Sequence, residues 1–222
     1  MGNRAIITTK DKGLGIYLHW NGGRDSVEPF LEYCRLQGYR CPEQDKSYAF
    51  ARLAQVIANY FGGSTSIGII ENCGDSICSD NGNYIIGRNF EIVGRDYPYE
   101  NFKEQNEYNL MDMLKEIDES QPTINQLGDF LYAPEKEVSS LKKGDIVYIQ
   151  DYDGKYDKYA IAGFGKDTVI NGTNVLGKPY IKKYGTRDDY KENINNYILT
   201  EKIRVCETDK TMKKEKAEEL EV

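Results

Sequence analysis

The sequence predicts an α+β protein: an N-terminal antiparallel sheet with two helices, then an acidic helical connector and a small SH3-like β-barrel. Three observations lead to this prediction. Alternating apolar residues flank two helical patterns in residues 1–98, acidic residues surround a third in 99–135, and short β-type stretches separated by turns fill 136–208. Residues 209–222 form a charged tail. At 222 residues, the chain is long enough for two folded units.

Residues 15–25 hold the only histidine and the only tryptophan of the chain. Apolar residues alternate here with Tyr17 and His19, which is the two-residue period of a strand, and residues 4–9 predict a strand that pairs with it. Asn21-Gly22-Gly23 favours a sharp turn because glycine and asparagine tolerate positive φ. We therefore expect a strand, a tight turn and then a helix.

Two helices are predicted in the first unit. The first begins with Asp25 as N-cap and Glu28 completing a capping box, and Gly38 marks its end. Its core-facing residues are Val27, Phe30, Leu31 and Cys34. The second spans residues 48–61, where apolar residues recur every three to four positions.

Strands are predicted at residues 66–71 and 84–87, joined by a hairpin turn at Asp80-Asn81-Gly82-Asn83, since Asn-Gly suits the primed turn types. Residues 90–94 continue or repeat the second of these strands. In the connector, residues 107–119 predict an acidic amphipathic helix.

His19 is the main candidate for catalysis, because imidazole exchanges protons near neutral pH and the helix N-terminus beside it favours anions. Two roles stay open. His19 is either a structural residue with a hydrogen-bonded ring, or the base of a metal-independent hydrolase or ribonuclease with Arg24, Asp25, Glu91 or Arg88 as partners. A site built on several histidines is excluded, because the sequence has no second one.

Two motifs carry a resemblance to a known group of proteins. The opening Met1-Gly2-Asn3-Arg4 and the later His19-Trp20-Asn21-Gly22 resemble small proteins of phages and mobile elements, which start Met-Gly-Thr-Arg and carry a His-Trp-Asp-Gly-Tyr-Pro-like turn before a helix. This chain differs in having Asn3 for Thr, and Asn21-Gly22-Gly23 where Asp-Gly-Tyr is commoner. The resemblance covers about the first 95 residues.

In mobile elements of Gram-positive bacteria, proteins of this type travel with anti-restriction and anti-CRISPR genes. The resemblance therefore implies, by association, a counter-defence protein such as a type II-A-like anti-CRISPR, and it identifies no catalytic residue. The partner it implies is a host defence nuclease or its ribonucleoprotein, with Trp20 and Asn21 as candidate contact residues.

The charge is uneven along the chain. The net charge is −7, and residues 101–140 carry nine acidic but three basic side chains. Non-specific binding to duplex DNA needs a basic face that displaces counterions, so this composition argues against it. It is compatible with binding to a basic protein surface, such as the groove of an enzyme that handles nucleic acid.

The five cysteines are expected to stay reduced, and no cofactor is expected. Four of them, Cys34, Cys41, Cys73 and Cys78, could supply zinc thiolates, but their spacings differ from the tight pairs of zinc ribbons. Buried free thiols are the alternative.

In the second unit, Lys-Gly-Asp before an alternating strand resembles the opening of small SH3-like barrels. Tyr180, Lys182, Lys183 and Tyr184 are candidate binding residues, because tyrosines with nearby lysines can contact protein or guide RNA. Ordinary packing within the sheet is the alternative for these tyrosines.

No apolar run approaches the roughly 20 residues that span a bilayer, and no signal segment opens the chain, so a cytoplasmic location in the host cell is expected. The leading hypothesis is an inhibitor that binds a CRISPR effector. The alternative is the hydrolase or ribonuclease centred on His19.

Overall fold

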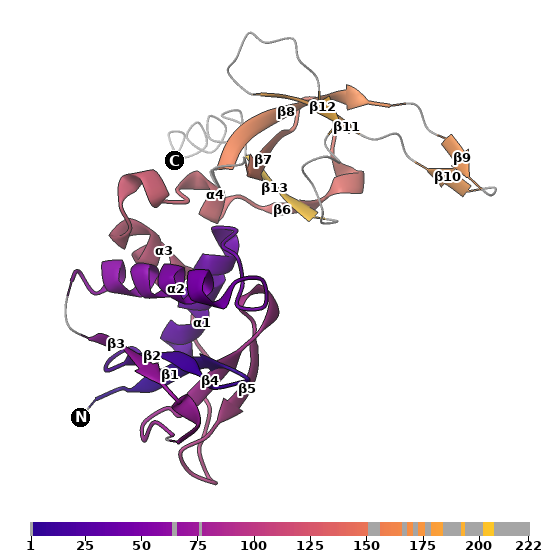
Figure 1. Cartoon of the computed structure of the whole chain (residues 1–222). Helices are drawn as coiled ribbons and strands as arrows, with labels where there is room; N and C mark the ends of the chain where they lie inside the picture. Colours follow the sequence, from indigo (N-terminus) through magenta and orange to yellow (C-terminus); the bar gives the residue numbers. More distant parts are fainter. Residues whose placement is uncertain are drawn as a thin grey trace. The chain divides into compact units, whose positions relative to one another are not determined.

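The computed structural model describes residues 2–63, 66–75, 77–150, 156–165, 168–170, 173–175, 179–183, 192–193 and 202–206. The chain divides into unit 1, residues 1–126, and unit 2, residues 127–222. Figure 1 shows the helices and strands of each unit. None of the helices among these residues is both long and apolar enough to cross a membrane.

Unit 1 contains a five-stranded sheet in the order β3-β2-β1-β4-β5. Its strands are β1 (Ala5–Thr9), β2 (Leu14–Leu18), β3 (Ile67–Glu71), β4 (Asn83–Ile86) and β5 (Ile92–Asp96). Strands β1 and β2 pair antiparallel as predicted, but β1 and β4 pair in parallel. The expectation of an antiparallel sheet is therefore corrected to a mixed sheet.

The predicted hairpin between β3 and β4 is also wrong, because β3 pairs with β2 at the edge of the sheet and β4 pairs with β1. Long-range contacts hold the start of β4 beside the start of β1. The guanidinium of Arg4 binds the Asp80 carboxylate with an Nε–Oδ2 distance of 2.8 Å, and Ile6 N–H donates to Gly82 O at 3.2 Å. Gly82 has φ +74 in the turn before β4, a conformation that glycine adopts readily.

Helices α1 (Arg24–Leu36) and α2 (Lys46–Tyr60) cover one face of this sheet (Figure 1). The four residues predicted to face the core from the first helix are buried. Gly38, at φ +67, follows α1, and the N–H of Tyr39 donates to Cys34 O. Gly38 therefore marks the end of the helix, as predicted. Asp45 caps α2 by accepting a hydrogen bond from Tyr48 N–H.

Helix α3 (Leu110–Ser120), which we expected in a connector, packs against α1 and α2 and belongs to unit 1. Leu114 and Ile117 are buried, as the apolar spacing indicates. A buried polar contact adds to this packing: the Tyr33 hydroxyl of α1 donates to Asp118 Oδ1 at 2.7 Å. The boundary between the units therefore follows α3 at Gln126.

Unit 2 begins with a short helix and continues as β-structure. Its elements are α4 (Asp129–Tyr132), β6 (Glu135–Glu137), β7 (Ile146–Gln150), β8 (Tyr156–Phe164), β9 (Thr168–Ile170), β10 (Thr173–Val175), β11 (Pro179–Lys183), β12 (Glu192–Asn193) and β13 (Lys202–Cys206). Short 3₁₀ helices in the two units are η1 (Cys73–Asp75), η2 (Arg88–Phe90), η3 (Thr123–Asn125) and η4 (Val138–Ser140).

Six of these strands form a sheet in the order β12-β11-β8-β7-β13-β6, and β9 pairs with β10. The pairings among the described residues leave β12 and β6 as edges, so they form an open sheet and not a closed barrel. The β-rich character is as predicted, while the SH3-like barrel stays a prediction. Aliphatic residues fill the core: Leu141, Val147, Ile149, Ile161, Ile181, Ile203 and Val205.

Candidate functional site

The turn that carries His19 is held by backbone contacts. His19 N–H donates to Ser66 O at 2.8 Å and its carbonyl accepts from Asn3 N–H at 3.2 Å. Gly22 lies so close to the first strand that a Cβ would come within 2.6 Å of the Arg4 carbonyl carbon. Asn21 takes φ +54, as the predicted turn requires. The turn is therefore fixed by the fold, and only glycine fits at position 22.

The His19 side chain is exposed, with Trp20 43% exposed beside it. Its Nδ1 lies 3.0 Å from the Tyr17 hydroxyl, and the rings of His19 and Trp20 meet edge to face with centroids 5.1 Å apart. Among the described residues, no hydrogen bond or ion pair joins His19 to Arg24, Asp25 or Glu91. A base with an orienting carboxylate is therefore not assembled around His19 in this part of the chain.

The predicted capping box at the start of α1 is wrong. Gly23 is the N-cap, its carbonyl accepts from Ser26 and Val27 N–H, and Asp25 already lies inside the first turn. A carboxylate in the first turn of a helix still interacts favourably with the helix dipole. Asp25 Oδ2 instead accepts from Gln105 Nε2 at 3.1 Å.

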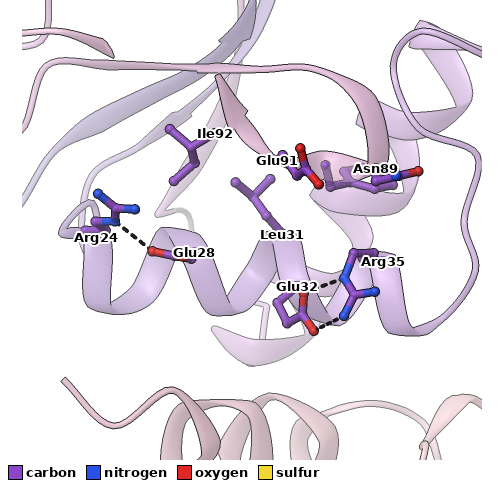
Figure 2. A pocket seen from close by; sticks show the side chains of 9 residues that line it. Arg24, Glu28, Leu31, Glu32, Arg35, Asn89, Glu91 and Ile92 are labelled. Carbon is purple, nitrogen blue, oxygen red and sulfur yellow. Dashed lines mark hydrogen bonds and ion pairs between the residues drawn. The ribbon is translucent and has the colours of Figure 1, made fainter. Parts of the chain in front are cut away.

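A pocket with a volume of ≈ 360 Å³ lies between α1 and the η2–β5 segment (Figure 2). Helix α1 contributes a stripe of charged side chains at successive turns. Arg24 Nε donates to Glu28 Oε2 at 2.7 Å, and Arg35 Nε donates to Glu32 Oε2 at 2.6 Å. Each arginine of this wall is thus already paired with a carboxylate.

The opposite wall comes from Asn89, Phe90, Glu91 and Ile92. Asn89 and Phe90 have φ of +55 and +60, an uncommon conformation for residues other than glycine. The turn is closed by two backbone hydrogen bonds, from Gly87 N–H to Glu91 O and from Glu91 N–H to Arg88 O. This backbone places Asn89 and Glu91 across from α1 (Figure 2).

Ionic contacts continue from the pocket into the segment before α3. Arg24 Nη1 lies 3.3 Å from Glu104 Oε1, which also pairs with Arg95 at 2.5 Å. The Tyr108 hydroxyl donates to Glu28. Burial disfavours the charged form of Glu28, but the hydrogen bonds from Arg24 and Tyr108 outweigh it and lower its pKa. Burial and the Glu28 carboxylate raise the pKa of Tyr108 to about 12.

Of the predicted catalytic residues, Arg24 and Glu91 line this pocket, whereas His19 and Asp25 do not. Arg88 is exposed and pairs with Glu43 at 3.1 Å. The pairing of Glu28 and Glu32 with the arginines was missed, although the spacings i, i+4 and i, i+3 along a helix signal it.

The binding residues expected in unit 2 lie in or beside β11. Tyr180, Lys182 and Lys183 belong to this strand, which pairs antiparallel with β8. Tyr184 lies outside the described residues, as does the tail 209–222. The RNA-contact role of these four residues stays a prediction.

The cysteines that could supply zinc thiolates lie mostly in the core. Cys34, Cys41 and Cys73 are buried free thiols, and Cys78 is half-buried. Burial raises the pKa of the Cys34 thiol, which disfavours the thiolate that binds metal. Within the described ranges, no group of three or more histidine, cysteine, aspartate or glutamate side chains is arranged to hold a metal ion.

Helix α3 presents a further charged surface. Asp112, Glu116 and Glu119 are exposed on the side of the helix away from the buried Leu114 and Ile117. We call these three carboxylates the acidic face of α3. One cation lies among them, Lys115, whose Nζ is 3.9 Å from Glu119 Oε1.

Comparisons of the chain with protein-family models, curated proteins and solved structures gave no match.

Proposed function

We propose that the protein is a counter-defence inhibitor that binds a host nucleic-acid-targeting nuclease, a CRISPR effector in particular, through the acidic face of α3. The observation that carries the proposal is the fixed orientation of this face. Leu114 and Ile117 are buried in unit 1 while the three carboxylates are exposed on the other side of the helix, so the packing of α3 sets which side carries the negative charge. The resemblance of the first 95 residues supports the counter-defence role.

Binding of this kind requires a basic partner surface. Enzymes that bind nucleic acid carry such surfaces, because lysines and arginines neutralise phosphates. Opposite potentials steer the two proteins together and align them. The proposal thus needs neither a metal nor a cofactor.

The test is cleavage of target DNA by a Cas9 ribonucleoprotein, with and without this protein, with the guide RNA run on a denaturing gel. We expect inhibition with an intact guide. A shortened guide would instead favour the ribonuclease alternative, and His19→Ala would then abolish activity with little change in the melting temperature. Full cleavage in the presence of the protein would contradict the proposal for this nuclease.

Charge-reversal variants locate the contact. The double variant Asp112→Lys with Glu116→Lys is expected to raise the half-inhibiting concentration about tenfold, because the new lysines would repel a basic partner surface. A tenfold change corresponds to about 1.4 kcal/mol of binding free energy. The control Glu43→Lys with Glu71→Lys makes the same change in net charge at exposed residues elsewhere in unit 1. Equal losses in both variants would show that net charge, and not the acidic face of α3, sets the inhibition.

A further inference from the structure

The pocket between α1 and β5 has one carboxylate that its own walls do not neutralise. Arg24 and Arg35 are held by Glu28 and Glu32, so these four side chains carry no net charge. Glu91 is exposed, and within the described part of the chain it forms no ion pair. The pocket lining therefore has an excess of one negative charge at Glu91.

The base of the same pocket is apolar. Leu31 is 2% exposed and Phe90 3% exposed, and Ile92 completes the apolar base. Figure 2 shows Leu31 rising from α1 and Ile92 facing it from the segment that carries Glu91. A volume of ≈ 360 Å³ falls within the range of small-molecule pockets, roughly 300–1,000 Å³.

An apolar base with a carboxylate at its edge suits a cation on a long aliphatic stem. Arginine has this form: its methylene groups pack on apolar surface, and its planar guanidinium donates to carboxylate and amide oxygens in a fixed geometry. Glu91 and Asn89 carry such acceptor oxygens on the same backbone turn. An anion would face the Glu91 carboxylate while both arginines are already paired, so its charge would be repelled rather than neutralised.

We propose that this pocket binds an arginine side chain of the partner protein, with the stem on Leu31 and Ile92 and the guanidinium at Glu91. The inference rests on the proposed function in one respect, that the occupant belongs to a protein. The preference for a guanidinium rests on the pocket alone. The pocket would thus provide a second contact with a basic partner surface, besides the acidic face of α3.

The test is a titration of the ¹⁵N-labelled full chain with N-acetyl-L-arginine amide, followed by NMR. The neutral isostere N-acetyl-L-citrulline amide is the matched control. We expect saturable shifts of the Leu31, Glu91 and Ile92 amides with the arginine probe, in the millimolar range that suits so small a ligand. Absence of these shifts, or equal shifts with both probes, would overturn the proposal.

Two variants separate a specific site from general attraction. Glu91→Gln is expected to weaken binding of the arginine probe by about two- to fivefold, because it removes the unpaired charge at an exposed position. Glu107→Gln removes an exposed carboxylate that does not line the pocket and is expected to leave binding unchanged. Equal weakening in both variants would contradict a specific site.

The probe titration involves no nuclease. A protein that binds the arginine probe but does not inhibit cleavage would keep the pocket assignment and contradict the proposed function. A protein that inhibits cleavage but does not bind the probe would contradict the pocket assignment and keep the proposed function.

Discussion

Helix α1 carries polar side chains on two sides, and the two sets differ in burial. On one side, the Tyr33 hydroxyl donates to Asp118 at 2.7 Å and accepts from Gln37 Nε2 at 3.0 Å, with all three residues buried. On the other side, the ion pairs of Arg24 and Arg35 are partly open to solvent and line a pocket. The first set fixes α3 to α1, whereas the second stays accessible to a ligand.

This comparison predicts that the largest loss of stability follows a change in the buried set. Tyr33→Phe should lower the free energy of unfolding by about 1–3 kcal/mol, because Asp118 loses a buried donor while the ring is kept. Urea unfolding of both proteins measures the difference.

Tyr60→Phe is the matched control for this variant. The Tyr60 hydroxyl lies 3.3 Å from the exposed Glu116, so its removal should change the stability by less than about 0.5 kcal/mol. Equal effects of the two variants would remove the distinction between the buried and the exposed set.

The buried set also predicts a dependence on alkaline pH. Burial, and then the adjacent Asp118 carboxylate, raise the pKa of Tyr33 well above its usual value. A raised pKa in the folded state contributes stability below the unfolded pKa of about 10, and this contribution is lost as the pH rises above that value.

The stability difference between the wild type and Tyr33→Phe should therefore narrow between about pH 9 and pH 11. Urea unfolding of both proteins across this range measures it. A constant difference would contradict the predicted linkage to Tyr33.

The smallest effect is expected from the exposed set. Glu32→Gln breaks the pair with Arg35 and should cost less than about 0.5 kcal/mol, an effect that high salt should remove. Thermal melts at low and high salt measure this. A loss above about 1 kcal/mol that persists in high salt would show that the exposed pair supports the fold as well.

Local patterns in the sequence were sufficient for the buried faces of the helices of unit 1, but not for the N-cap of α1. Val27, Phe30 and Leu31 are buried at helical spacing, and Gly38 ends α1 as glycine's access to positive φ predicts. The parallel position of β4 could not be predicted in this way, because it depends on contacts such as Arg4 with Asp80, 76 residues apart. The Asn81-Gly82 signal is local and fits a hairpin equally well.

The candidate site was predicted only in part. Arg24 and Glu91 were named for catalysis with His19, but the structure places them in a pocket that His19 does not line. Their proximity depends on β5 returning beside α1, which no local pattern reveals. The exposure of Trp20 likewise depends on tertiary structure, whereas Tyr17 and His19 share a face because they are two residues apart in an extended stretch.

Co-elution of the full chain with a Cas9 ribonucleoprotein on size-exclusion chromatography, at low and at high salt, tests whether the protein binds this nuclease through opposite charges. We expect a complex at low salt with intact guide RNA, and less of it at high salt, because opposite charges form the contact. The Asp112→Lys with Glu116→Lys variant should form less complex than the wild type at low salt. Separate elution of the wild type at low salt would contradict the claim for this nuclease.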